Sequence, residues 1–547
     1  MLRSLVLQLL SGRRLSKIGD ILYRCNARCQ SGHCLIYNKL GNMKRLLLIV
    51  LLLAHCGAWA QNSAVKKIQQ MAIEDNRTMQ HLDILCNRIG GRPIGSDAYD
   101  NAVDWAVKQF KEWGIEVTTE EAGQMSVGFN RGGWWGRMSG EEQMVLHFAT
   151  PSYTSGTKGP QTGHVVIEPR TQAEFDRMKG KLKGAWVLVN GQSRGTNIPH
   201  SEKATAARKK IIEANAEAAK YNREVAGQDG EKKPIDTTTP ALFYDEMVAA
   251  GVLGFIQSAP VPITAAYDRE VVYDSITFEN LPTVPDIKLD EEQYARIHKL
   301  VSQRRQIELT FDIRNYFKLG PVPYHNVVAT IKGSKYPEEI VIVGCHLDAY
   351  DVATGGVDCG SGVSAVMEAA RMIAASGAKP ERTIKFILFA GEEFGLLGAK
   401  AWVAQHEKDL DKISNVFNRD GGPMPYTSFS VPKSLVKEYE TVADAVREIY
   451  PDYNFKIHPL EPREVPKTPG GTDATVFMTK GIPAQQMNEH VDTKGYNFSY
   501  YEIWHTERDT FDKSIPEYQN QAAATMAIMV LGTANLSTQW PRNEVYK

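Results

Sequence analysis

Residues 339–376 have the sequence EIVIVGCHLDAYDVATGGVDCGSGVSAVMEAARMIAAS. The segment from Glu339 to Gly344 is almost continuously apolar, as in strands that are buried on both faces. From Ser361 to Ser376, apolar residues recur at i, i+3 and i+4, which predicts a helix. A second apolar run follows from Thr383 to Ala390. This alternation predicts an α/β fold with a mixed, mostly parallel sheet that is flanked by helices.

The composition of the whole chain is that of a globular protein. Of its 547 residues, 43% are hydrophobic and 23% are charged. This length predicts two folded units and a targeting segment rather than a single core. The formal net charge of -1 lacks the basic excess that is typical of proteins that bind nucleic acids or anionic membranes. The function must therefore be inferred from local motifs.

The segment that begins at Met43 has the three parts of a cleavable signal peptide. Lys44-Arg45 is basic, residues 46–54 are apolar, and Ala58-Trp59-Ala60 fits a small-residue cleavage site. The apolar run is much shorter than the roughly 20 residues of a membrane-spanning helix, so no stable membrane anchor is expected. We predict that residues 43–60 are a signal peptide and that the protein is secreted or periplasmic.

Residues 1–42 precede this signal and contain arginines and cysteines without a clear period. One hypothesis is that translation starts at Met43, and the alternative is a transit or regulatory extension. After cleavage the chain would keep three cysteines, Cys86, Cys345 and Cys359. Three cysteines do not build a disulfide framework, so the fold must depend on its hydrophobic core.

Changes in the sequence pattern divide the remaining chain into three parts. Residues 61–139 contain a helical pattern from Asp97 to Trp113 and form the first part of the main domain. In residues 140–315, short apolar strands alternate with loops and with one polar helix near residues 201–222. This change predicts an inserted domain. Residues 316–547 return to the strand and helix alternation and complete the main domain.

Ionisable residues follow the predicted strands of this last part. They are His346, Asp348, Asp358, Glu392, Glu393, Asp420 and His505. Alone, each motif is weak, because a Glu pair in a loop is commonly solvated and a lone His commonly lies at the surface or in a core. In α/β sheets, however, ligands bind beyond the carboxyl ends of the strands. We therefore expect these side chains to meet at one edge of the sheet.

Such a cluster of acids requires a compensating charge. Carboxylates that gather at one edge repel one another and lose hydration energy. A pair of divalent cations supplies the missing charge, and two histidines with three carboxylates suit zinc. Hydrolysis would also need one carboxylate that stays unligated as a base, and adjacent Glu392 and Glu393 can serve as base and ligand. Asp348 can orient His346 through the other ring nitrogen.

Together these motifs resemble the family-28 di-zinc exopeptidases, which include aminopeptidases and glutamate carboxypeptidase, from about residue 70 to 535. The resemblance is carried by Gly91–Ser96, Gly333–Pro337, His346-Leu347-Asp348, Asp351-Val352, Asp358, Glu392-Glu393, Asp420, Gly471-Thr472-Asp473, Gly481-Ile482-Pro483, and His505 with Asp509-Thr510. It implies the zinc exopeptidase fold, two bound Zn²⁺ ions, and a protease-associated domain inserted at residues 140–315.

The resemblance also implies five metal ligands. Asp358 would bridge the two zinc ions. His346 and Asp420 would complete the coordination of the first ion, and Glu393 and His505 that of the second.

Two further roles follow by resemblance. Glu392 would be the general base of the catalytic group, in which Asp348 orients the first histidine. Asp473 would contact the substrate, and the alternative is an N-cap for the helix predicted over residues 474–480.

The expected activity is that of a secreted zinc exopeptidase whose partner is a short peptide or dipeptide substrate. An aminopeptidase or dipeptidase is favoured, and a carboxypeptidase is the alternative. A non-catalytic binding protein on the same fold and a single-zinc acyltransferase of the glutaminyl cyclase type are disfavoured by the complete set of ligands and base. The sequence leaves the oligomeric state open, a homodimer included.

Three residues depart from the family pattern. Cys359 follows Asp358, where the family has Asp or Asn, and Cys345 precedes the first histidine ligand. The favoured interpretation is two small buried residues, with a disulfide or a soft additional metal ligand as alternatives. Trp504 precedes the second histidine ligand, where aminopeptidase relatives often have Tyr, so a tyrosine contact to the substrate oxyanion is in doubt there.

Overall fold

The computed structural model describes residues 63–226, 231–267, 276–420, 422–489 and 499–547. Residues 64–547 form one compact unit. The predicted extension and signal peptide, residues 1–60, lie outside the described residues. Among the helices that are described, none is both long and apolar enough to cross a membrane.

We call residues 141–306 the inserted segment and the remaining described residues the main part. The main part begins with a helix over residues 63–74. Its other main helices are α4 (Thr78–Asp83), the π-helical turn Ile84–Ile89, α5 (Asp97–Glu112), α10 (Gly360–Ser376), α11 (Leu397–Gln405), α12 (Val436–Ile449), α13 (Ala474–Met478) and α14 (Pro516–Ala534). Its strands are β1 (Glu116–Gly140), β8 (Ile307–Ile331), β9 (Tyr336–His346), β10 (Arg382–Phe389), β11 (Ile413–Asn418), β12 (Tyr426–Val431), β13 (Lys456–Pro459) and β14 (Met487–Glu489).

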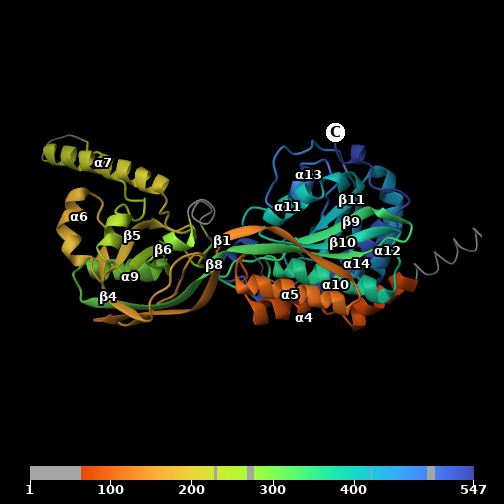
Figure 1. The fold of residues 1–547 in the computed structure, drawn as a ribbon, viewed down its shortest axis with the longest axis horizontal. Coiled ribbons are helices and arrows are strands. Elements are labelled where there is room, and N and C mark those ends of the chain that lie inside the picture. The colour runs from red at the N-terminus through yellow and green to blue at the C-terminus, as the bar shows by residue number, and fades with distance from the viewer. Residues whose placement is uncertain (1–62, 227–230, 268–275, 421, 490–498) are drawn as a thin grey trace, which may run out of the picture. The chain divides into compact units, whose positions relative to one another are not determined.

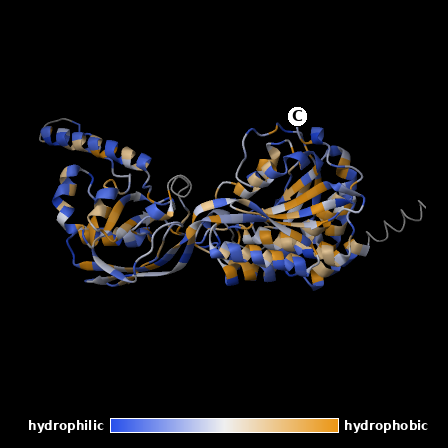
Figure 2. Ribbon diagram, in the orientation of Figure 1, coloured by the Kyte–Doolittle hydropathy of each residue, from blue (hydrophilic) through white to orange (hydrophobic). Residues whose placement is uncertain are grey.

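The inserted segment has its own strands and helices. Its strands are β2 (Met144–Val145), β3 (Phe148–Ala149), β4 (Gln161–Ile167), β5 (Trp186–Gln192), β6 (Gly254–Ala259) and β7 (Asp286–Asp290). Its helices are α6 (Gln172–Met178), α7 (Glu202–Glu224), α8 (Tyr244–Ala249) and α9 (Glu291–Ser302). Helix α7 is the polar helix that the sequence predicts near residues 201–222, and most of its residues are hydrophilic (Figure 2).

One large sheet runs through both parts. Its strand order is β11-β9-β10-β8-β4-β5-β6-β7-β3, with β1 paired to β8. Strand β9 is parallel to β10 and β11, and β4 to β7 are parallel to one another. Strand β8 is antiparallel to both β10 and β4. The predicted α/β fold with a mixed sheet is therefore confirmed. The strands are parallel among β9, β10 and β11 and among β4 to β7, and they are antiparallel where β8 joins these two groups.

Strands β1 and β8 connect the inserted segment to the main part. They pair antiparallel from Glu116↔Thr330 to Gly140↔Ile307. The C-terminal half of β8 pairs with β10, and its N-terminal half pairs with β4. Strand β1 ends at Gly140, beside the first predicted domain limit, whereas β8 runs through residue 315, so no strand end marks the second limit.

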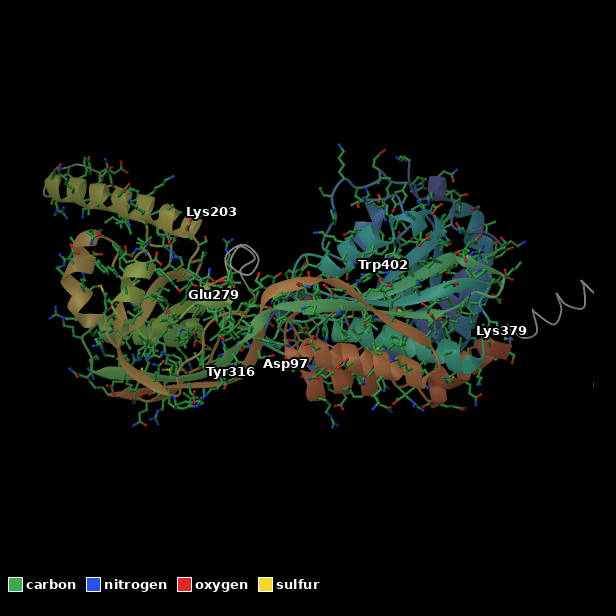
Figure 3. All side chains as sticks on the ribbon, in the orientation of Figure 1. Asp97, Lys203, Glu279, Tyr316, Lys379 and Trp402 are labelled. Atoms are coloured by element: carbon green, nitrogen blue, oxygen red, sulfur yellow. The ribbon has the colours of Figure 1, made fainter. Side chains whose placement is uncertain are left out.

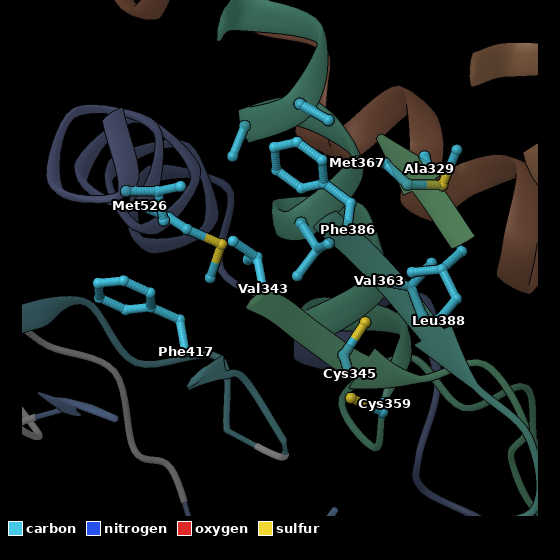
Figure 4. Packing of buried hydrophobic residues seen from close by; sticks show 14 of the residues in the cluster. Ala329, Val343, Cys345, Cys359, Val363, Met367, Phe386, Leu388, Phe417 and Met526 are labelled. Carbon is cyan, nitrogen blue, oxygen red and sulfur yellow. The ribbon is translucent and has the colours of Figure 1, made fainter. Parts of the chain in front are cut away.

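Helices cover both faces of the sheet around β9 and β10, with α10 on one side and α11 and α13 on the other (Figure 1). Alternate residues of a strand point to opposite faces. Val343 and Phe386 accordingly pack with residues of α10 and α14 (Figure 4). Ile342 packs on the other face, in a cluster with the fully buried Trp402 of α11 (Figure 3). This two-sided burial explains why the strand sequences are continuously apolar.

Helix α10 is positioned closely against the ends of the neighbouring strands. A Cβ atom at Gly362 would lie 2.3 Å from the carbonyl oxygen of Arg419, and one at Gly356 would lie 2.2 Å from that of Thr510. Any larger residue at these two positions would push the backbone segments apart. The glycines therefore allow the loop before α10 to approach the segments that follow β11 and precede α14.

Candidate metal centre

Three of the five predicted metal ligands lie at the ends of three neighbouring strands. His346 is the last residue of β9, Glu393 follows β10, and Asp420 follows β11. Because β10 and β11 both pair parallel to β9, their carboxyl ends lie at the same edge of the sheet. Asp358 lies in the loop before α10, and His505 lies in the segment before α14.

The structure brings these five side chains into direct contact. His346 Nε2 lies 3.1 Å from an oxygen of Asp358 and 3.2 Å from an oxygen of Asp420. His505 Nε2 lies 3.4 Å from the other oxygen of Asp358 and 3.0 Å from Glu393 Oε2. Asp358 thus stands between the two histidines, each of which has a second carboxylate beside it. A carboxylate that bridges two metal ions, each held by one histidine and one further carboxylate, requires this arrangement.

The chemistry of these donors fits divalent metal ions. Asp358 and Glu393 are buried, and Oε1 of Glu393 has no hydrogen-bond partner within the described structure. Burial, together with nearby negative charges, raises the pKa of Glu393 and that of Glu392. Nitrogen and oxygen donors of this kind suit Zn²⁺. The assignment of each residue as a ligand stays a prediction.

Asp348 is expected to orient His346 with its carboxylate, but the carboxylate makes its shorter contacts elsewhere. Nδ1 of His346 lies 3.0 Å from the main-chain oxygen of Asp348 and 3.5 Å from its carboxylate. The carboxylate accepts hydrogen bonds from the backbone N–H groups of Glu392, at 3.1 Å, and Glu393, at 3.3 Å. The carbonyl therefore makes the shorter contact with the histidine, while the side chain positions the loop that carries the predicted base.

Asp473 is fully buried, and neither of its carboxylate oxygens has a hydrogen-bond partner among the described residues. Asp473 occupies the N-cap position of α13, but its side chain makes no capping hydrogen bond to that helix. The neighbouring Thr472 lines the cavity described below, whereas Asp473 is not among the lining residues. Contact between Asp473 and a substrate stays a prediction.

A cavity of about 630 Å³ opens onto this centre. Among the residues that line it are Asp358, Glu392, Glu393, Asp420 and His505. Aromatic rings surround the second histidine: Trp504 stacks on His505 at 3.9 Å between ring centroids, and Tyr350 meets it edge-on at 4.6 Å. Four of the five predicted ligands and the predicted base therefore face a space that is large enough for a small peptide, while His346 is fully buried.

Comparison with known proteins agrees with this arrangement. Residues 326–531 match peptidase family M28. This segment is a peptidase family M28 domain. It spans β9, β10 and β11 and contains each of the predicted metal ligands, so the resemblance inferred from the motifs is confirmed.

The motif pattern also indicates carboxypeptidase Q within the family, and proteins of that name match this chain. Carboxypeptidase Q from Mus musculus is 24% identical over 487 residues, which cover 86% of this chain and 88% of that protein. The protein of the same name from Xenopus laevis is 25% identical over 540 residues, 91% of this chain and 100% of that protein. The crystal structure of a peptidase M28 precursor from Shewanella amazonensis has a TM-score of 0.54 and 21% identity, covers 89% of this chain and 99% of that chain, and shows a shared fold.

The two cysteines beside the centre are free thiols and fully buried, so the structure has no disulfide at this place (Figure 4). Sγ of Cys359 donates to the main-chain oxygen of Arg419 at 3.2 Å. The favoured interpretation of two small buried residues agrees with these contacts. Cys359, His346 and Asp420 also hold ligand atoms within 4.8 Å of one another, so the soft-ligand alternative stays open.

Sequence motifs did not reveal every residue that orders this M28 centre. The carboxylate of Asp509 accepts hydrogen bonds from the backbone N–H groups of Val357, at 2.6 Å, and Asp358, at 3.2 Å. It thereby ties the segment that carries His505 to the loop of the bridging residue. In the sequence, only the position of Asp509 four residues after His505 indicated that it could matter. Its hydrogen bonds to the loop of Asp358 are visible only in the folded structure.

Proposed function

We propose that this chain is a zinc-dependent exopeptidase that hydrolyses short peptides or dipeptides with two Zn²⁺ ions. The observation that supports the proposal most directly is the position of Asp358 between His346 and His505, with Asp420 and Glu393 on either side. Zinc ions bound there would polarise the scissile carbonyl group and lower the pKa of water. The relation to family M28 gives the same reaction class independently.

In this proposal, Glu392 is the general base. Its backbone is held by Asp348, and its side chain faces the same cavity as four of the five predicted ligands. Burial favours its protonated form in the absence of positive charge, which suits a group that must hold and release a proton. Glu392 would take a proton from water and deliver it to the departing amine.

An aminopeptidase or dipeptidase is the first candidate, and a carboxypeptidase is the second. The second candidate is favoured by the similarity to proteins named carboxypeptidase Q over most of the chain. It is also favoured by Lys400, which carries the one permanent positive charge among the described residues that line the cavity. A cation at that position could attract the terminal carboxylate of a peptide.

A panel of substrates separates these candidates. The zinc-loaded protein is incubated with free dipeptides, N-acetylated dipeptides and C-amidated dipeptides, and released amino acids are measured. Loss of hydrolysis on N-acetylation alone indicates an aminopeptidase, loss on C-amidation alone indicates a carboxypeptidase, and loss on both indicates a dipeptidase. Absence of zinc-dependent hydrolysis of all three would refute the proposed function.

We also propose that residues 43–60 direct secretion and that residues 140–315 form a protease-associated domain that shapes the substrate entrance. The signal-peptide pattern and the separate hydrophobic clusters of the inserted segment support these two assignments. N-terminal sequencing of the mature protein tests the first assignment, because it predicts a start near Gln61. An intact N-terminus at Met1 on protein from the producing cell would refute it.

A further inference from the structure

The segment around His505 is held by the inserted segment. Thr506 and Thr264 form an antiparallel bridge. The N–H of Glu507 donates to the oxygen of Ile263 at 3.0 Å, and the N–H of Ile263 donates to Oε1 of Glu507 at 3.1 Å. One isolated antiparallel bridge and two hydrogen bonds thus lie one or two residues from a predicted zinc ligand.

His147 adds a second link to the same segment. Its Nε2 lies 2.8 Å from Oε2 of Glu507, and its Nδ1 lies 3.1 Å from Asp290. Both oxygens of the Glu507 carboxylate are therefore bound by groups of the inserted segment. Glu507 has no freedom to leave this position without breaking three contacts.

The backbone of His505 needs such support. Its φ angle is 59°, in the left-handed region that residues other than glycine rarely adopt. A residue in that region keeps its conformation only where the surrounding contacts hold it. The contacts of Thr506 and Glu507 immediately follow this residue and can supply that support.

Tyr267 of the inserted segment contacts the other ligand of the same predicted ion. Its buried hydroxyl donates to the main-chain oxygen of Glu393. Its ring stacks on Phe394 with centroids 4.0 Å apart and an interplanar angle of 12°. The loop that carries Glu393 is thus held by a residue more than 120 positions away in the sequence.

The ligands predicted for the other ion have different supports. His346 ends the central strand β9, and the residue before Asp420, Arg419, donates its N–H to the oxygen of Gly344 in the same strand at 3.0 Å. The guanidinium of Arg419 also binds Glu489 of β14 at 2.8 Å. These supports all belong to the main part of the molecule.

We infer that His147, Ile263–Thr264 and Tyr267 are positioning residues for one of the two metal ions, the one bound by Glu393 and His505. The inference rests on the proposed di-zinc function. It assigns the inserted segment a share in the metal site itself, in addition to any effect on the substrate entrance. Loss of these contacts should weaken one zinc-binding step and leave the other unchanged.

The test uses two variants with matched controls. Tyr267→Phe removes the hydroxyl that contacts Glu393, and His147→Ala removes the link to Glu507. Tyr294→Phe removes a hydroxyl that donates to Val189 at 2.7 Å inside the inserted segment, and His164→Ala removes a ring that contacts Lys181 at 2.8 Å. The controls therefore lose the same kind of group from the same segment, away from the metal centre.

Zinc binding to the metal-free full-length chain is measured by isothermal titration, and bound zinc is counted by atomic emission after dialysis against a zinc buffer. Substitutions around metal ligands typically weaken binding about 10- to 100-fold. We expect a loss of that size in one step for each of the two test variants, and none for the controls. Thermal unfolding of the metal-free variants reports any general damage to the fold.

Three results would overturn the inference. If the wild type binds two zinc ions and hydrolyses peptides while both test variants keep both affinities, the positioning role is refuted and the proposed function stands. If both steps weaken equally, the contacts stabilise the whole fold rather than one ion. A wild type that binds no zinc would refute the proposed function and, with it, this inference.

Discussion

The inserted segment and the metal centre both contain buried acids, but different groups accompany them. In the inserted segment, Glu168 accepts from the guanidinium of Arg170 at 2.9 Å, and Asp286 lies 2.9 Å from the fully buried ammonium of Lys288. In the metal centre, Asp358, Glu393 and Asp420 form their ion-pair contacts with two histidines. The first group of acids is paired with the permanent cations Arg170 and Lys288, whereas the second is paired, among the described residues, only with histidines, whose side chains are also common metal ligands.

This difference separates structural charges from functional ones. A buried carboxylate is stable only when a positive charge or several hydrogen-bond donors accompany it. Where the chain supplies Arg or Lys, the pair can be explained by folding alone. Where acids gather without such partners at a strand edge, a cation from solution is the remaining source of positive charge.

The largest effect should come from the predicted base. Glu392→Gln removes the group that accepts the proton, so we expect turnover to fall roughly 10²- to 10⁴-fold. Zinc content should remain at the wild-type value, because Glu392 is not a predicted ligand. The matched control is Glu464→Gln at an exposed site, which should keep full activity. Near-normal turnover of Glu392→Gln would show that another residue is the base.

A paired charge of the inserted segment should affect stability instead of chemistry. Lys288→Met leaves Asp286 buried without its cation, which typically costs about 3–5 kcal/mol of unfolding free energy. Denaturant unfolding of the zinc-loaded protein measures this loss. Lys66→Met, which breaks an exposed pair with Glu448, should leave the unfolding free energy almost unchanged. Equal costs for the two variants would contradict the distinction between buried and exposed pairs.

Removal of zinc should destabilise the main part because its acids lose their neutralising charge. For a single site with zinc at about 100 times the dissociation constant, binding adds about 2.7 kcal/mol to the unfolding free energy. Chelation should lower the melting temperature, and added zinc should restore it. In Asp358→Asn the bridging charge is lost, so added zinc should have little effect. A melting temperature that zinc leaves unchanged in the wild type would contradict the cation interpretation.

The smallest effect should be a pH dependence at the contact between the two parts. Burial lowers the pKa of His147, but its hydrogen bonds to Glu507 and Asp290 outweigh this and raise the pKa above its ordinary value of 6.5. The folded state therefore binds the proton more tightly than the unfolded state. The stabilisation is fully present below pH 6.5 and is lost as the pH rises through the raised pKa.

Comparison of the wild type with His147→Ala isolates this contribution. The difference between their unfolding free energies should shrink as the pH rises from about 6 to 9. Denaturant titrations at several pH values, with zinc held constant, measure it. A difference that stays constant over this range would show that His147 contributes only through neutral contacts.

The sequence by itself determined the central strands, the long helix after them, and the identity of the charged residues at the strand ends. The strand predicted over residues 339–344 lies within β9, and the helix predicted from Ser361 corresponds to α10. These features are local, because burial on two faces or on a helix leaves a periodic pattern in the residues themselves. Since parallel strands end at a common edge, the convergence of His346 and Asp420 could also be predicted.

The tertiary structure alone decided how that edge is supported. The contact of Tyr267 with Glu393, that of His147 with Glu507, and the hydrogen bonds of Asp509 join residues that lie more than 120 positions apart. It also decided that the long antiparallel strands β1 and β8 would connect the inserted segment to the main part. Such contacts depend on how whole segments pack, and they leave no local period in the sequence.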